Sequence, residues 1–170
     1  MRWIIALLVI AATGCNANYK QTVLIEPKSR MEAGMPVVIA TPADGAYGVR
    51  PYKNSGRMVA AALREAIISH SKQADIAEES SGTGLDRFSV DKYRYYIEPT
   101  ILHWEDRATE WSGKSDRITV QIDLFDLQTH DKIAASVIEG KSKWATFGGD
   151  HPQDLLLDPF RQYFDQLYGE

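Results

Sequence analysis

The N-terminus constrains the folding of this chain most, because it carries the only cysteine among 170 residues. Arg2 supplies a positive charge, residues 3–12 form an apolar run, and small residues lead up to Cys15. This run falls far short of the ~20 residues that a membrane-spanning helix needs, so it predicts a cleaved secretory signal. A chain with one cysteine cannot close an internal disulfide, and its folded domain must be stabilised by packing.

The segment that ends at Cys15 resembles the lipobox of bacterial lipoproteins, with Ala12 where that family usually has leucine. In the family the signal, here residues 1–14, is removed and acyl chains are attached to the cysteine thiol and to the new N-terminus. Asn16 follows the cysteine in place of the aspartate that retains lipoproteins in the inner membrane. The resemblance implies lipidation of Cys15 and a place on the periplasmic face of a Gram-negative outer membrane.

Two other interpretations of this segment stay open. It is also compatible with an ordinary secretory signal beside a chance cysteine, or with a buried first helix of a cytosolic protein. The polar residues Asn16 and Asn18 suit a solvated tether better than a packed helix. Each buried CH₂ contributes about 0.8 kcal/mol, so two or three acyl chains would anchor a protein firmly where a single chain would not.

The charge balance argues against nucleic-acid binding. The chain has 19 Lys and Arg against 23 Asp and Glu, a formal net charge of −4, and removal of residues 1–14 takes away one further cation, Arg2. A nucleic-acid-binding domain would instead show a basic patch or stripe. Once its cysteine is acylated, the mature domain has no thiolate for metal binding or catalysis, and we predict neither a metal nor a cofactor.

The remaining sequence predicts a lipidated tether over residues 15–35 and one globular domain over residues 36–170, long enough to bury a core. Residues 22–25 are compatible with a short edge strand. Residues 36–40 form an apolar, β-branched run between prolines, which favours a buried strand. Residues 58–67 place apolar side chains at helical spacing, and Asn54 or Ser55 is the expected N-cap of that helix.

The second half of the chain has the pattern of an antiparallel sheet. Residues 93–106 have strand composition, with Pro99 marking an edge or a bulge. Residues 118–124 alternate apolar and polar side chains, and residues 133–144 return as a further strand. A last helix is expected to start at Asp150 to Pro152 and to kink or split at Pro159. The sum predicts a single α+β domain: a mixed sheet with a βα start, an antiparallel meander and helices packed on the sheet.

Two blocks resemble the signatures of a bacterial lipoprotein family that is known only as a domain of unknown function. They are residues 99–107, PTILHWEDR, and residues 138–152, IEGKSKWATFGGDHP. The order of elements is also similar to that of periplasmic assembly lipoproteins. These include the curli-secretion lipoprotein, activators of peptidoglycan synthases, an exopolysaccharide-export lipoprotein and the N-terminal domain of the Tol-system propeller protein. The resemblance implies a docking or assembly module without a catalytic centre.

A small set of residues offers candidate chemistry. His103 and Glu105 would share one face of a strand, and Asp150 and His151 could join them from the last loop to hold a proton or a metal. Zinc would need three or four such ligands at about 2.0–2.2 Å, and their spacing here is generic. The competing interpretation is a strand-end ion pair of Glu105 or Asp106 with Arg107, Arg117 or Lys141.

Three tryptophans form the second candidate. Trp104, Trp111 and Trp144 could stack on sugar rings of an envelope glycan, or they could be core and loop anchors, the usual role of so large an apolar side chain. We therefore expect a non-enzymatic, lipid-anchored interaction or assembly module for an envelope complex. Its partner would be an unknown envelope protein or polymer. The alternatives are a glycan- or peptidoglycan-binding module and, third, a metal-dependent hydrolase.

Overall fold

The computed structural model describes residues 17–77, 85–107, 115–142 and 151–169. In these residues a six-stranded sheet has the order β1-β8-β7-β6-β2-β5. Neighbouring strands are antiparallel from β1 to β6 and parallel from β6 to β5. The strands are β1 (Asn18–Ile25), β2 (Val37–Ala40), β5 (Ala74–Ala77), β6 (Tyr95–Glu105), β7 (Arg117–Asp126) and β8 (Asp131–Lys141). A separate two-stranded ribbon is formed by β3 (Ala46–Tyr47) and β4 (Arg50–Pro51).

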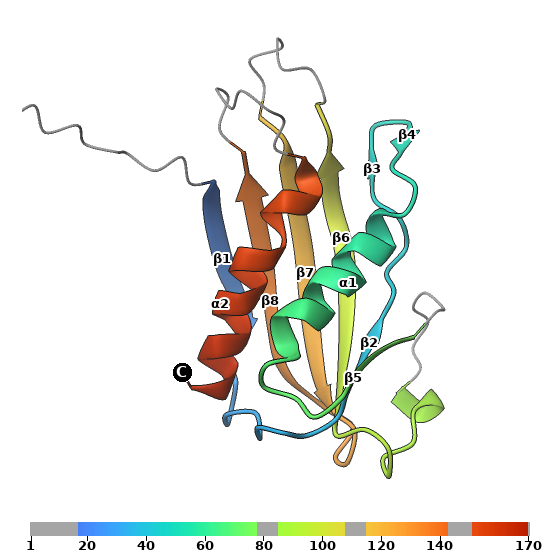
Figure 1. Cartoon of the computed structure of the whole chain (residues 1–170), viewed down its shortest axis with the longest axis vertical. Coiled ribbons are helices and arrows are strands. Elements are labelled where there is room, and N and C mark those ends of the chain that lie inside the picture. The colour runs from blue at the N-terminus through green and yellow to red at the C-terminus, as the bar shows by residue number, and fades with distance from the viewer. Residues whose placement is uncertain (1–16, 78–84, 108–114, 143–150, 170) are drawn as a thin grey trace, which may run out of the picture.

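Two helices cover one face of the sheet. Helix α1 (Ser55–Ile67) and helix α2 (Leu157–Tyr168) lie side by side on that face and contact each other (Figure 1). Two 3₁₀ turns, η1 (Leu85–Arg87) and η2 (Pro152–Leu155), precede β6 and α2. The predicted α+β domain, with its βα start and antiparallel meander, is thus confirmed.

The main core lies between the sheet and the two helices. Alternate residues of β7, Ile118, Val120, Ile122 and Leu124, are at most 1 % exposed. They pack with fully buried side chains of the helices, such as Leu63. Each buried side chain of this size contributes about 1.5–3 kcal/mol, so this core supplies most of the driving force for folding. A smaller cluster on the other face of the sheet buries Val38, Ala40 and Tyr96. The other residues of β7 point to the opposite face of the sheet.

A β-bulge in β6 fixes which side chains enter this core. The pairing of β6 with β7 shifts between Ile101, which pairs with Val120, and His103, which pairs with Thr119. The extra residue, Leu102, is 53 % exposed. After the bulge Trp104 pairs with Ile118 and faces the helices. Without it, the alternation of a strand would turn residue 103 inward with Ile101.

Pro99 lies beyond the point where the pairing of β6 with β2 ends. Strand β2 pairs with β6 only as far as Ile97, so the side of β6 that β2 occupied is free of ladder partners at residue 99. On that side the missing N–H of proline leaves no ladder bond unmade. The predicted edge position is correct in this local sense, whereas the bulge falls at Leu102.

Strand β1 is longer than the edge strand expected at residues 22–25. All eight of its residues lie within the segment 15–35 that was expected as a tether, and it pairs with β8 from Asn18 to Ile25. Part of that expected tether therefore belongs to the sheet. No helix in the described parts of the chain is long and apolar enough to cross a membrane.

Asn54 occupies the N-cap position of α1, as predicted, but it does not supply the capping hydrogen bond. Asn54 has φ 69° and its side chain does not cap the helix. Asp44, ten residues upstream, accepts hydrogen bonds from the backbone N–H groups of Asn54 and Gly56 at 3.0 and 2.9 Å. Ser55 is occupied otherwise, since its hydroxyl accepts from the N–H of Gly45 at 2.8 Å. A carboxylate from the preceding loop thus satisfies the free donors of the first turn.

The last helix also starts differently. His151 is the N-cap of η2 and shares a capping box with Asp154, and α2 begins only at Leu157. Pro159 therefore lies in the first turn of α2, where its missing N–H breaks no helical hydrogen bond. The prediction of a split helix is correct, but the split precedes Pro159. The predicted cap Asp150 lies outside the described residues.

Gly56→Ala tests how closely α1 approaches the preceding loop. A Cβ at residue 56 would lie 2.1 Å from the carbonyl oxygen of Pro42, a backbone atom that cannot rotate away. Alanine would normally stabilise a helix by about 1 kcal/mol relative to glycine, and overpacking costs about 1–3 kcal/mol. We expect Gly56→Ala to lower the urea midpoint of unfolding.

The exposed Ala61→Gly in the same helix is the control, expected to cost about 1 kcal/mol through propensity alone. A Gly56→Ala protein as stable as the wild type would contradict the close approach.

Candidate functional site

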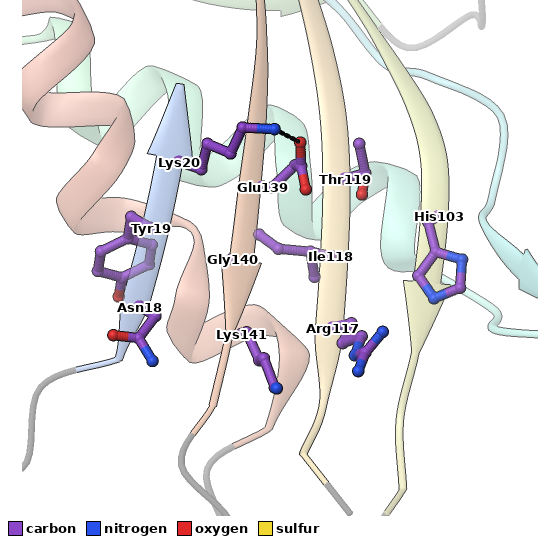
Figure 2. A pocket seen from close by; sticks show the side chains of 10 residues that line it. All are labelled: Asn18, Tyr19, Lys20, His103, Arg117, Ile118, Thr119, Glu139, Gly140 and Lys141. Atoms are coloured by element: carbon purple, nitrogen blue, oxygen red, sulfur yellow. Dashed lines mark hydrogen bonds and ion pairs between the residues drawn. The ribbon is translucent and has the colours of Figure 1, made fainter. Parts of the chain in front are cut away.

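An open pocket of about 560 Å³ lies across one end of the sheet, where β1 and β7 begin and β6 and β8 end. Its charged lining residues, with Asn18 and Thr119, lie on four strands and face away from the helices (Figure 2). Strand pairing sets these residues in two rows across the sheet. The first row is Asn18, Lys141, Arg117 and Glu105, and the second is Lys20, Glu139, Thr119 and His103.

The charge of the pocket is opposite to that of the whole chain. Lys20 forms an ion pair with Glu139, with the Nζ and Oε1 atoms 3.2 Å apart. Arg117 and Lys141 are direct cross-strand partners, and neither makes an ion pair with any residue that the structure describes. The pocket lining thus contains three cations, Lys20, Arg117 and Lys141, and one carboxylate, Glu139. The whole chain, by contrast, has a formal net charge of −4.

The direct pairing of Arg117 with Lys141 is unfavourable by itself. Side chains directly opposite in an antiparallel pair have Cβ atoms about 4.5–5.5 Å apart, and like charges at that spacing are destabilising. Both side chains are exposed, which lets water and salt screen them. An anion held between them would relieve the repulsion, so this arrangement favours a negatively charged ligand.

Two buried polar residues fix the strand ends below the pocket. The N–H of Asp116 donates to the Ser142 hydroxyl at 2.9 Å, and the N–H of Ser142 donates to the carbonyl of Asp116 at 3.0 Å. The Asp116 carboxylate accepts from the N–H of Arg107 at 2.6 Å. These bonds join the end of β6 to the start of β7 and the end of β8, so the rows of the pocket are held by rigid backbone.

The predicted pair His103 and Glu105 is present, but as part of an ion-pair chain. The Nε2 atom of His103 lies 3.4 Å from Oε2 of Glu105, and Arg107 pairs with Oε1 of the same carboxylate. The Glu105 side chain is only 4 % exposed, and that of Arg107 is 28 % exposed. This is the strand-end ion pair that the sequence allowed, with Arg107 and neither Arg117 nor Lys141 as the partner.

The electrostatics of Glu105 oppose a role as a general acid. Burial raises its pKa, but hydrogen bonds from Arg107 and His103 and their charges outweigh burial, so the net pKa is lowered. A carboxyl group that donates a proton near neutral pH needs a raised pKa. Glu105 is therefore a carboxylate at pH 7, engaged by its two neighbours.

The other two members of the predicted cluster do not complete a site. His151 is exposed, and its backbone N–H donates to the Asp154 carboxylate at 3.0 Å, so it serves as a helix cap. Asp150 lies outside the described residues. Within the described ranges, no group of three or more His, Cys, Asp or Glu side chains is placed to hold a metal ion.

Trp104 is not the exposed platform that one hypothesis required. Its side chain is 2 % exposed and packs in the main core, because the β6 bulge turns it toward the helices. This corrects the proposed binding surface at that residue and agrees with the alternative of core packing. Trp111 and Trp144 lie outside the described residues.

The basic pair of this pocket was not found as a site from the sequence. The sequence indicated Arg117 and Lys141 only as ion-pair partners of Glu105 or Asp106. Lys20 lies in the segment expected as a tether. The alternation in residues 118–124 indicates that this strand has a polar face. This is the one sequence feature that could have pointed to a site here. Only the register of four strands shows that these polar residues are neighbours.

Comparison with known proteins identifies the family and the fold. Residues 29–167 match the family model described as a domain of unknown function, DUF4823, so the chain belongs to that family. This confirms the predicted domain of unknown function, while the lipoprotein nature of the family stays a prediction. No curated protein matches the sequence.

Solved structures share the fold at low sequence identity. The chain resembles the PelC dodecamer from Paraburkholderia phytofirmans with TM-score 0.66 and 11 % identity, covering 90 % of this chain and 98 % of that one. It also resembles the hypothetical protein CT253 from Chlamydia trachomatis with TM-score 0.51 and 15 % identity, covering 80 % and 97 %. Protein XCC0632 from Xanthomonas campestris, of the DUF330 family, gives TM-score 0.50 and 13 % identity, covering 85 % and 88 %. At these identities the likeness concerns the fold alone.

Glu105→Gln tests the ion-pair chain. The lowered pKa means that the folded state binds the proton more weakly than the unfolded state does. The stabilisation is therefore present above the ordinary pKa of 4.5 and is lost as the pH falls through the lowered value. We expect Glu105→Gln to lower the free energy of unfolding at pH 7, measured with a denaturant, by about 2 kcal/mol. The difference in unfolding free energy between the variant and the wild type should narrow below pH 4.

Glu65→Gln is the matched control, because Glu65 pairs with Arg161 at 3.0 Å with both side chains at least half exposed. Its expected cost is under about 1 kcal/mol. Equal losses of unfolding free energy in the two variants would refute a stabilising role for the Glu105 ion pairs. So would a loss for Glu105→Gln that stays constant from pH 7 to pH 3.

Proposed function

We propose that this DUF4823 protein is a lipid-anchored, non-catalytic interaction module on the periplasmic face of the outer membrane. In this proposal, acyl chains on Cys15 hold the domain at the membrane, and the uncovered face of the sheet is the surface that meets an envelope partner. The short link of chain between Cys15 and the start of β1 is the observation that carries it.

Cys15 precedes the first residue of β1, Asn18, by three positions. A link of three residues spans at most about 11 Å. An acylated Cys15 would therefore hold the domain close to the bilayer by the end of the sheet that carries the pocket. The shortness of this link favours a fixed orientation, in which the same sheet end always faces the lipid.

The uncovered sheet face supports the interaction role. Helices α1 and α2 both lie on the opposite face (Figure 1). On the face without helices a small buried cluster covers Val38 and Tyr96, and Thr100, Thr119 and Gln121 lie outside that cluster. This part of the face is the uncovered one. His103 and Glu105 are the residues that the sequence suggested for acid–base chemistry. They pair with each other, and Glu105 also pairs with Arg107. The likeness in fold to the PelC chain, which is described as a dodecamer, supports a role in an assembly.

The anchor is tested by mass spectrometry of the N-terminal peptide from protein purified out of bacterial membranes. We expect cleavage before Cys15 and a mass increase that accounts for a diacylglycerol on the thiol and an acyl group on the amine. The Cys15→Ser variant should lose this modification and leave the outer-membrane fraction. An unmodified thiol or a retained residue 1–14 segment would refute the anchor.

The interaction face is tested by a photoreactive amino acid introduced at Thr100, on the uncovered face, or at Met58, which is 39 % exposed on α1. We expect irradiation of living cells to give a discrete cross-linked species from residue 100 and none from residue 58. The same yield from both positions, or no product from residue 100, would contradict a partner on this face.

A further inference from the structure

We propose that the pocket around Arg117 and Lys141 binds the phosphate group of an anionic phospholipid headgroup in the membrane that anchors the chain. The inference deepens the proposed function, because it rests on the membrane lying at this end of the domain.

The charges of the pocket select an anion. Glu139 is engaged by Lys20, and Glu105, the cross-strand neighbour of Arg117, is engaged by Arg107 and His103. Arg117 and Lys141 are thus left facing each other without an acidic partner among the described residues. A phosphate diester carries one negative charge and two free oxygens, so one such group can accept hydrogen bonds from both cations at once.

The neutral groups of the pocket fit the same ligand. The Asn18 amide lies beside Lys141, and the Thr119 hydroxyl lies on the same strand as Arg117 (Figure 2). Both are hydrogen-bond donors that can complete the shell of a phosphate or of a headgroup hydroxyl. The open shape of the pocket admits a headgroup from one side while its acyl chains remain outside.

The position of the pocket selects the membrane as the source of the phosphate. Asn18 lines the pocket and lies three residues after Cys15, within about 11 Å of chain length. That distance is close to the Debye length of ~8–10 Å at physiological salt, so the cations remain within reach of the negative surface potential of the bilayer. The rest of the domain carries the net negative charge, which favours the pocket end as the one turned toward the lipid.

The test uses the full chain purified from bacterial membranes in a neutral detergent. It is titrated with glycerophosphoglycerol, the soluble headgroup of an anionic phospholipid, and binding is followed by the NMR shifts of the Thr119 and Glu139 amides. Glycerophosphocholine and inorganic phosphate are the comparison probes. Loss of one hydrogen-bonded ion contact at an exposed site weakens binding by about 5-fold, so Arg117→Gln/Lys141→Gln should weaken binding of glycerophosphoglycerol ~25-fold.

The matched control is Lys28→Gln/Arg57→Gln, which removes the same charges from exposed positions outside the pocket. Its affinity should stay within 2-fold of the wild type. Each single substitution in the pocket should weaken binding about 5-fold, and the thermal midpoint of every variant shows that it is folded. Equal losses in the two double variants would overturn the site.

The source of the phosphate is decided by placing the full chain in bicelles. Bicelles that contain phosphatidylglycerol should shift the same two amides relative to phosphatidylcholine bicelles, and the pocket double variant should not respond. Inorganic phosphate binding more tightly than glycerophosphoglycerol, or no response to the anionic bicelles, would overturn the lipid assignment. The soluble headgroups report on the pocket whether or not Cys15 is acylated, so failure of the site and failure of the anchor are distinguished.

Discussion

The packing of both helices on one face of the sheet is the constraint on which the rest of this structure depends. Helices α1 and α2 both pack on the same face (Figure 1), and alternate apolar residues of β7 and β8, such as Ile122 and Ile138, belong to the core between them and the sheet. Because side chains alternate along a strand, this choice sends every second residue to the other face. On that other face a smaller buried cluster covers β2 and the start of β6, whereas Thr119 and Gln121 of β7 are polar and partly exposed.

The bulge at Leu102 adapts β6 to this constraint. It changes the side to which the last residues of the strand point, so Trp104 enters the core while His103 and Glu105 lie on the polar face. A buried Trp contributes a large apolar surface, and a buried His–Glu pair in its place would need partners for its polar atoms. The bulge therefore serves stability and also brings His103 to the rim of the pocket.

The pocket lies at the end of the sheet where β1 begins, three residues after Cys15 in the sequence, and this short link connects the two proposals. Asp116 and Ser142 tie the strand ends together at this point, so the cations of the pocket are carried by backbone that is already hydrogen-bonded. Preorganised charge of this kind attracts an anion without a large ordering cost. An interaction module of this design would present one defined end to the membrane and its polar sheet face to a partner.

The sequence by itself determined the local elements and the fold class. The alternation in residues 118–124, the apolar run at 36–40 and the helical spacing over 58–67 each depend on neighbours along the chain, and each element was found. The ion pair at the end of β6 was also within reach, since Glu105 and Arg107 are two residues apart. The tertiary structure decided what depends on distant partners: the inclusion of β1 in the sheet, the cap supplied by Asp44, the burial of Trp104 and the juxtaposition of Arg117 with Lys141. These features follow from strand register and loop placement, which arise from packing between residues far apart in the sequence.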